Sequence, residues 1–235
     1  MTMGLLTAIR DFLAPDICPI CKEELVNPAI RLCDRCYGEF TPLPKNRCPA
    51  CGGPGDSLMK QCRSCLSVPE RPWQVAVSAF EFDGLARTAI HRLKYRGRRE
   101  LAPLFARHLA ENWRKYSEDF APDVITPIPL HWWRWIKRGY NQAGEVASFL
   151  SKELGIPCKG LLRRTRYTRE QVTLTAQKRL ENLKSAFEAS DDVKGKRVLI
   201  VDDVFTTGAT LTAAAQTMLK KRAKAVAVIT IARDI

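Results

Sequence analysis

One run of residues is the most informative about the architecture, and it reads Val198-Leu-Ile-Val-Asp-Asp-Val-Phe-Thr-Thr-Gly-Ala-Thr210. Its first four residues are apolar and predict a fully buried strand that ends at Val201. Two adjacent carboxylates, Asp202 and Asp203, follow, and a turn rich in Thr and Gly then leads into a helical pattern. Backbone N–H groups of such a turn, with the N-terminus of the next helix, can bind a phosphate. The stretch therefore predicts a phosphate site, with two acids beside it that can accept hydrogen bonds from the vicinal hydroxyls of a sugar.

Eight residues of this stretch are candidates for contact with such a ligand. The threonine hydroxyls add hydrogen-bond donors, and Gly208 allows the backbone to approach the ligand closely. A simpler interpretation is that the two acids only cap a turn, which suits an isolated Asp-Asp pair better than the whole run. The candidates are Asp202, Asp203, Val204, Thr206, Thr207, Gly208, Ala209 and Thr210.

The chain around this stretch alternates between strand and helix patterns from Trp73 onward. Such alternation predicts an α/β fold with a parallel sheet flanked by helices on both faces. Ligands bind beyond the carboxyl ends of the strands in sheets of this kind, so we expect the chemistry to follow Ile128 and Val201. Strands are predicted over 75–82, 124–128, 198–201 and 225–231, and helical faces over 85–93, 101–109, 143–154 and 211–219.

The N-terminal part of the chain is marked by cysteine pairs with the spacing Cys-x-x-Cys. Two such pairs supply the four thiolates that Zn²⁺ prefers in a tetrahedral structural site. We favour sequential sharing, in which the first two pairs bind one zinc and the last two another. A crossed arrangement and redox disulfides are the alternatives. The predicted metal ligands are Cys18, Cys21, Cys33, Cys36, Cys48, Cys51, Cys62 and Cys65.

This cysteine-rich segment forms the first of two predicted units. It has few apolar residues, so metal binding is expected to supply its folding free energy. Pro69 and Pro72 mark the join. We predict a zinc-ribbon module with a short N-terminal helix over residues 1–70 and an α/β domain over residues 71–235. A closed Cys₄ site keeps no open coordination position, so its role is structural or that of a platform for a partner.

The charge balance of the chain is strongly basic. It has 38 Lys and Arg against 25 Asp and Glu among 235 residues, a formal net charge of +13. Such a surface attracts polyanions such as nucleic acid or pyrophosphate-bearing sugars, although it also promotes solubility alone. The sequence has no secretory signal and no apolar run of the roughly 20 residues that a membrane span needs. We therefore expect a cytoplasmic protein with reduced thiols.

The run from Val198 to Thr210 resembles the phosphoribosyl pyrophosphate motif of type I phosphoribosyltransferases. In that family the paired acids contact the ribose hydroxyls, the loop after them holds the 5-phosphate, and Mg²⁺ bridges ribose and pyrophosphate. Further runs resemble the ComF family over nearly the whole chain, including its double zinc ribbon. These runs are Leu93-Lys-Tyr-Arg-Gly97, Pro127-Ile-Pro-Leu130, Lys137-Arg-Gly-Tyr-Asn-Gln142 and Leu162-Arg-Arg-Thr-Arg166.

The resemblance implies a type I phosphoribosyltransferase fold and an enzyme that transfers phosphoribose to or from a nitrogenous acceptor. Its setting would be DNA uptake in natural transformation, or nucleoside metabolism. We expect Lys94 and Arg138, with Asp202 and Asp203, to act in catalysis, and Lys137 and Arg138 to bind the pyrophosphate. For these basic residues the alternative is a solvated surface.

The polar, basic stretch after residue 162 resembles the flexible loop that closes over the substrate in phosphoribosyltransferases. Closure would exclude water from the reactive sugar. A solvated face is again the alternative interpretation. The residues assigned to this loop are Arg163, Arg164, Arg166, Gln171 and Arg179.

Three tryptophans, Trp132, Trp133 and Trp135, lie beside basic residues. Aromatic side chains interleaved with cations can stack the bases of single-stranded nucleic acid, and packing against the cysteine module is the alternative. The ComF link to transformation implies a second hypothesis, a single-stranded DNA-binding protein without turnover. A third is a scaffold whose zinc ribbons recruit another DNA-processing protein. No residue identifies the acceptor base.

Overall fold

The computed structural model describes residues 17–23, 25, 32–55, 61–117, 119–165 and 186–235. Its centre is a four-stranded sheet in the order β1-β6-β5-β2. The strands are β1 (Ala76–Glu81), β2 (Val124–Pro127), β5 (Arg197–Phe205) and β6 (Ala225–Arg233), and every neighbouring pair is parallel. These pairings confirm the predicted parallel sheet. Parallel neighbours are joined by helical crossovers, which bury the apolar strands on both faces.

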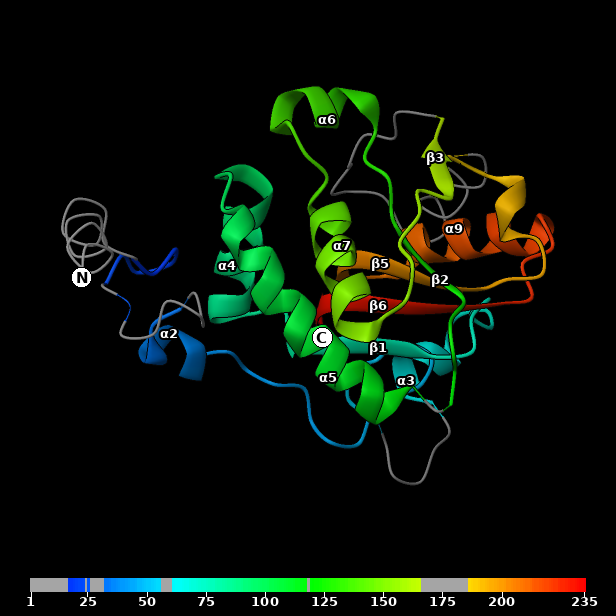
Figure 1. The fold of residues 1–235 in the computed structure, drawn as a ribbon. Helices are drawn as coiled ribbons and strands as arrows, with labels where there is room; N and C mark the ends of the chain where they lie inside the picture. The colour runs from blue at the N-terminus through cyan, green and yellow to red at the C-terminus, as the bar shows by residue number, and fades with distance from the viewer. Residues whose placement is uncertain (1–16, 24, 26–31, 56–60, 118, 166–185) are drawn as a thin grey trace.

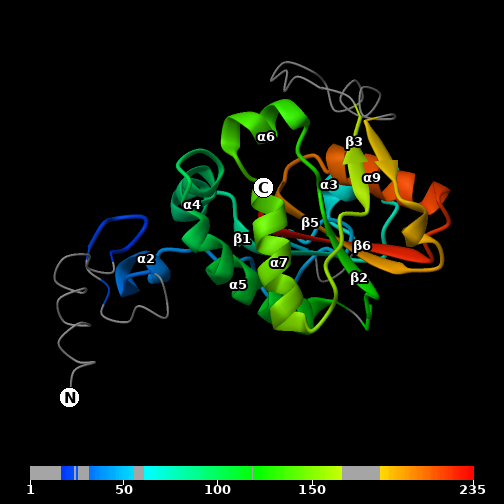
Figure 2. The same ribbon diagram turned by 45° about the horizontal axis from the view of Figure 1, so that its top comes forward.

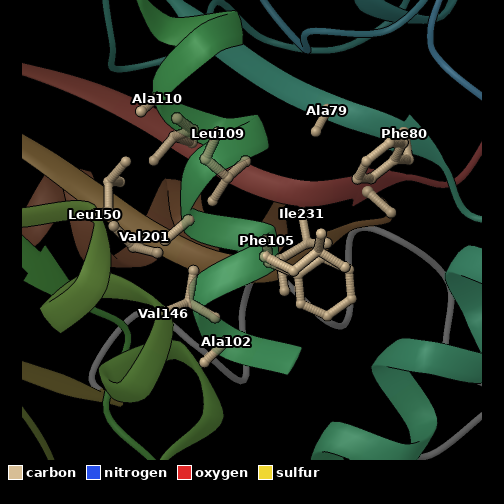
Figure 3. Packing of buried hydrophobic residues seen from close by; sticks show 14 of the residues in the cluster. Ala79, Phe80, Ala102, Phe105, Leu109, Ala110, Val146, Leu150, Val201 and Ile231 are labelled. Carbon is tan, nitrogen blue, oxygen red and sulfur yellow. The ribbon is translucent and has the colours of Figure 1, made fainter. Parts of the chain in front are cut away.

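Helices cover both faces of the sheet (Figure 1). α4 (Gly84–Tyr95), α5 (Ala102–Tyr116) and α7 (Gln142–Leu154) lie on one face, and α9 (Ala209–Lys220) lies on the other. Figure 3 shows Phe105 and Leu109 of α5 and Val146 of α7 packed over Val201 and Ile231 of the central strands. No helix in the described part of the chain is long and apolar enough to cross a membrane.

The central strand β5 is longer than the sequence predicts. The prediction that it ends at Val201 is wrong, because Asp202 and Asp203 still belong to the strand, which ends at Phe205. β6 pairs with β5 as far as Arg233. Main-chain pairing of β5 therefore continues beyond its apolar run, which ends at Val201. The two acids are therefore held by a rigid strand rather than by a turn.

Four smaller features complete the described part of this domain. η1 (Arg99–Leu101) precedes α5, α6 (Trp132–Arg138) follows β2, and the antiparallel pair β3 (Leu162–Arg164) and β4 (Phe187–Ala189) precedes η2 (Asp191–Val193). Two residues assigned to a flexible loop, Arg163 and Arg164, lie in strand β3 instead, where cross-strand pairing with β4 orders them. The other three, Arg166, Gln171 and Arg179, lie outside the described residues.

The cysteine module is divided between the two faces of the sheet. The first four cysteines lie near α2 (Asp34–Gly38), and Cys18 and Cys36 share a core with α4 and α5. The last four lie near α3 (Arg63–Leu66), and Cys48, Cys51 and Cys65 share the core of α9. Between them the chain follows the outer edge of β1, where Pro42 pairs antiparallel with Phe80. The predicted domain boundary at residue 70 stays a prediction.

Candidate functional site

The acid pair of the site lies near the carboxyl end of β5, where residues from three elements meet. Asp203 is buried, with 6% of its surface exposed. Its Oδ1 lies 2.8 Å from Lys94 Nζ of α4, and its Oδ2 accepts a hydrogen bond of 2.6 Å from Gln142 Nε2 of α7. Burial disfavours the charge of Lys94, but the attraction of Asp203 outweighs it and raises the lysine pKa. Asp203 and Lys94 therefore form a fixed ion pair beneath the site.

Asp202 has a different environment from its neighbour. It is half-buried, and its Oδ1 accepts a hydrogen bond of 2.9 Å from the Asp203 backbone amide. Burial and the negative charge of Asp203 raise its pKa to about 7, although the Asp203 amide and Lys94 oppose the shift. A cation or hydroxyl donor near this carboxylate would favour its ionised form. Asp202 is therefore the acid with capacity for a ligand.

The turn after β5 offers backbone donors to a ligand. Gly208 precedes α9 with a φ of 76°, and a Cβ at this position would lie 2.8 Å from Phe205 Cζ. A larger residue would therefore be strained there and would collide with the ring. Among the described residues, no acceptor binds the amides of Thr206, Thr207, Gly208 and Thr210. These amides at the start of α9 can bind an anion.

Two arginines that sequence reasoning missed hold the carbonyl groups of this turn. Arg71 Nη2 donates to Thr207 O at 3.0 Å and Nη1 to Thr212 Oγ1 at 3.3 Å. Arg233 Nη1 donates to Phe205 O at 3.0 Å and to Thr206 O at 2.9 Å. The turn's carbonyls are satisfied by protein, which leaves its amides for a ligand. Neither arginine belongs to a motif, so no local signal could have found them.

Arg138 lies on the other side of the acid pair, at the end of α6. Its Nη1 donates to Gln142 Oε1 at 3.0 Å, and its guanidinium lies 4.5 Å from the ring centre of Tyr95. Gln142 therefore links Arg138 to Asp203. Of Lys137 the structure describes only the backbone, within α6. The contact between Gln142 and Asp203 was also missed, although Gln142 ends one of the quoted runs.

The three indoles of α6 are exposed to solvent. Trp132, Trp133 and Trp135 have 60%, 55% and 55% of their surface exposed. The alternative in which they pack against the cysteine module is therefore wrong, because α6 lies above α4 and α7 at the far edge of the domain (Figure 2). His131 precedes the helix and its ring nitrogen accepts from the Trp133 amide, at 3.4 Å, which fixes the start of α6.

The eight paired cysteines form two clusters in the order of the chain. Within each set of four, the Sγ atoms all lie within 4.8 Å of one another. Sequential sharing is confirmed, and the crossed arrangement is wrong. Cys21 and Cys33 Sγ are 3.3 Å apart and Cys51 and Cys62 Sγ are 3.7 Å apart, so four soft donors can reach one ion in each cluster. The donor sets fit structural zinc.

The comparisons with known proteins agree with this architecture. A profile described as a double zinc ribbon domain matches residues 9–66, and one described as a phosphoribosyl transferase domain matches residues 133–235. DNA utilization protein YhgH of Escherichia coli strain K12 is 34% identical over 225 residues, covering 94% of this chain and 98% of that protein. Competence protein F of Haemophilus influenzae is 32% identical over 203 residues, covering 83% of this chain and 86% of that protein. The chain belongs to the ComF family.

This ComF protein has the type I phosphoribosyltransferase fold joined to two Cys₄ clusters. Among solved structures, purine phosphoribosyltransferase from Pyrococcus horikoshii Ot3 is 28% identical, with 55% of this chain and 70% of that chain covered and a TM-score of 0.34. In the ComF chain, Lys94, Gln142 and Asp203 meet at one point, and Arg138 joins them through Gln142. Arg163 lies apart, paired with Glu188 at 2.7 Å.

Proposed function

We propose that this ComF protein binds phosphoribosyl pyrophosphate with Mg²⁺ at the carboxyl end of β5 and transfers phosphoribose to or from a nitrogenous acceptor. One observation carries the proposal. A half-buried carboxylate, Asp202, lies just before a turn whose amides have no acceptor among the described residues. A phosphorylated sugar has complementary groups, because its phosphate suits the amides and its hydroxyls suit the acid.

The 5-phosphate would bind to the amides and hydroxyls of residues 206–210, where the N-terminus of α9 favours negative charge. Asp202 would accept hydrogen bonds from the ribose hydroxyls. Asp203 would hold Lys94 and Gln142 in place from below. The carboxylate of Asp202 suits Mg²⁺, which commonly binds one or two carboxylates together with substrate phosphates. When bound, Mg²⁺ would supply positive charge to the pyrophosphate.

In the transfer step the bond from C1 of the sugar to pyrophosphate breaks and a bond from C1 to the acceptor nitrogen forms. Negative charge increases on the leaving pyrophosphate. Lys94, Lys137 and Arg138 would stabilise that charge, and fixed cations are effective there because they need little reorganisation.

The setting of the reaction is proposed from the relatives. Their printed names, DNA utilization protein and Competence protein F, support a role in DNA handling. We place the protein in the cytoplasm, with single-stranded DNA and another DNA-processing protein as candidate partners. The exposure of Trp132, Trp133 and Trp135 supports contact with unpaired bases, because solvent-accessible indoles can stack on them.

Calorimetry with phosphoribosyl pyrophosphate and Mg²⁺ tests the proposal. We expect wild-type protein to bind, and Asp202→Asn to weaken binding at least about tenfold because a charged hydrogen bond is lost. Asp192→Asn is the matched control, since Asp192 is exposed and lies in η2, away from the site. Release of pyrophosphate with a series of nitrogenous bases then tests turnover. Folded wild-type protein that fails to bind the ligand would rule out the proposal.

A further inference from the structure

The turn between α6 and α7 carries a motif of which the proposed function uses only the first residue. The run reads Arg138-Gly-Tyr-Asn-Gln142, and its other members fix the course of the chain. Gly139 ends α6 in the left-handed conformation, with a φ of 77°. Asn141 caps the start of α7, where its Oδ1 accepts a hydrogen bond of 3.1 Å from a backbone amide. The Tyr140 hydroxyl donates to Leu93 O of α4, so the turn is anchored to a neighbouring helix.

Gln142 is the member of this motif that contacts the acid pair. It is buried, with 4% of its surface exposed, yet both ends of its amide have a partner. Nε2 donates to Asp203 Oδ2 at 2.6 Å, and Oε1 accepts from Arg138 Nη1 at 3.0 Å. An ionised carboxylate can only accept and a guanidinium can only donate, so this orientation of the amide alone satisfies both. Gln142 therefore joins a cation to a buried acid.

The two cations beside the acid pair differ in the charge that they leave for a ligand. Lys94 Nζ lies 2.8 Å from Asp203 Oδ1, so an acid balances its charge. In the described part of the chain no carboxylate pairs with Arg138, which is held by the neutral amide of Gln142. A carboxylate in place of this amide would hold the guanidinium at least as firmly but would balance its charge. The amide leaves the positive charge of Arg138 available to an anion.

Tyr95 gives the guanidinium a second contact. The centre of its ring lies 4.5 Å from the Arg138 guanidinium carbon, a distance at which a cation is attracted to an aromatic face. Tyr95 follows Lys94 at the end of α4, so the contacts form a closed cycle that begins and ends on this helix. The members of the cycle are Lys94, Asp203, Gln142, Arg138 and Tyr95. The elements that hold the acid pair therefore also hold Arg138.

We propose that Gln142 is a positioning residue, which holds the Arg138 guanidinium at the pyrophosphate end of the site without neutralising it. The inference rests on the proposed binding of phosphoribosyl pyrophosphate and adds to it a side chain that acts through another residue. A cation that is fixed before the ligand arrives needs little reorganisation, so it attracts an anion more effectively. Substitution of Gln142 should therefore affect the pyrophosphate end of the site and spare the phosphate end at residues 206–210.

Calorimetry with two probes separates these ends. Magnesium pyrophosphate probes the end near Arg138, and ribose 5-phosphate probes residues 206–210 and Asp202. Gln142→Met keeps the length of the side chain but loses the hydrogen bond to a charged group at each end, so it should bind magnesium pyrophosphate about tenfold more weakly and ribose 5-phosphate within about twofold of wild type. Gln216→Met, an exposed change on α9, is the matched control and should bind both probes as wild type does.

A double-mutant cycle tests whether Gln142 acts through Arg138. Arg138→Ala should weaken magnesium pyrophosphate binding about tenfold, because a charge-assisted contact is lost. Adding Gln142→Met to Arg138→Ala should weaken binding by less than about twofold more, since two residues that serve one contact are not additive. Full additivity would overturn the proposal, and so would equal weakening of ribose 5-phosphate binding by Gln142→Met. Either result would make Gln142 a purely structural residue.

Gln142→Glu tests the requirement for a neutral partner. The introduced carboxylate can still accept from Arg138, but it balances the charge of the guanidinium and repels Asp203. We expect magnesium pyrophosphate to bind at least about tenfold more weakly at pH 8, although the guanidinium is still held. Binding as tight as that of wild type would show that the charge of Arg138 is not used, and the proposal would be wrong.

The wild-type protein separates failure of this inference from failure of the proposed function. Folded wild-type protein that binds neither probe nor phosphoribosyl pyrophosphate would overturn the proposed function, and the positioning role with it. Wild-type protein that binds both probes, together with an additive cycle, would overturn the positioning role alone. Thermal unfolding of every variant shows whether a loss of binding is a loss of folded protein.

Discussion

The two cysteine clusters share one motif but are connected to different parts of the molecule. The first contacts α4 through the hydrogen bond from Arg92 to Pro19 and borders a cavity that is lined by basic side chains of this helix. The second is linked through Trp73 to Phe205 at the end of β5, next to residues 206–210, which we call the phosphate loop after the function proposed for them. Trp73 Nε1 donates to Ala50 O at 2.9 Å, and the indole lies edge-on to Phe205 with ring centres 5.9 Å apart. Identical metal ligands therefore support two different surfaces.

This difference shows that a closed Cys₄ site takes its role from what packs against it. Both clusters offer the same four thiolates, and neither has an open position for chemistry. The second reaches the turn after β5 through Arg71, which lies over both Trp73 and Phe205 and donates to Thr207 O. We expect the two clusters to be separable by mutation.

The largest effect is expected from removing one ligand of each cluster. Cys62→Ser and Cys21→Ser are matched, since both thiols are half-buried. Each should reduce zinc content by about one equivalent, because a structural site needs all four ligands. Cys62→Ser should weaken phosphoribosyl pyrophosphate binding by roughly a hundredfold. Metal binding supplies folding free energy to the second cluster, and this cluster supports the phosphate loop. Cys21→Ser should leave this affinity within about twofold.

Metal analysis and calorimetry on the purified variants measure these outcomes. If Cys21→Ser also weakened phosphoribosyl pyrophosphate binding a hundredfold, the two clusters would act as one unit. The proposed difference between them would then be wrong.

A smaller effect is expected from the arginines that join each cluster to the domain. Arg71→Ala removes two hydrogen bonds to the loop and to Thr212, each worth about 0.5–1.5 kcal/mol, so ligand affinity should fall by about tenfold. Arg71→Lys should recover only part of this affinity, because a lysine ammonium cannot reproduce the two parallel donors of the guanidinium. Arg92→Ala removes the hydrogen bond to Pro19 O and should leave the affinity for phosphoribosyl pyrophosphate unchanged. The same calorimetry measures all three, and equal losses at Arg71 and Arg92 would contradict the assignment.

The pH dependence of binding sharpens the comparison further, since it should belong to the phosphate-loop side alone. The pKa of Asp202 rises from 3.8 to about 7 because of burial and Asp203, so ionisation opposes folding and the unliganded protein loses stability as pH rises through this range. Ligand binding has the opposite sign. Affinity for phosphoribosyl pyrophosphate with Mg²⁺ should rise with pH up to about 7, by as much as tenfold per unit.

Titration calorimetry at several pH values measures this dependence, with Asp202→Asn as the variant that should lose it. A profile that persists in Asp202→Asn would assign the titration to another group.

The smallest effect is expected from Trp73→Phe. It keeps the ring that packs on Phe205 but removes the hydrogen bond to Ala50 O, so the free energy of unfolding should fall by about 1 kcal/mol. The matched change on the other cluster is Tyr37→Phe, an exposed residue, which should stay within about 0.5 kcal/mol of wild type. Urea unfolding measures the free energy of unfolding of both variants. A larger decrease for Tyr37→Phe than for Trp73→Phe would contradict this prediction.

The parallel sheet, the positions of its strands and the cysteines of both clusters could be predicted from the order of residues alone. These features are local. Apolar runs, Cys-x-x-Cys spacing and the Thr/Gly turn after Asp203 each predict a structure from a few neighbouring residues. The sequence also placed Lys94, Arg138 and the acid pair near one site. The end of β5 was misplaced at Val201, since the pairing of Asp202 with Thr230 depends on a neighbouring strand.

Two features could be learned from the folded arrangement alone: which cysteine cluster supports which surface, and which side chains hold the phosphate loop. Arg71 and Thr207 are 136 residues apart, and Lys94 meets Asp203 across the gap between α4 and β5. Contacts of this kind arise when the packing of helices on a sheet brings distant segments together, and they leave no periodic or spacing signal in the chain.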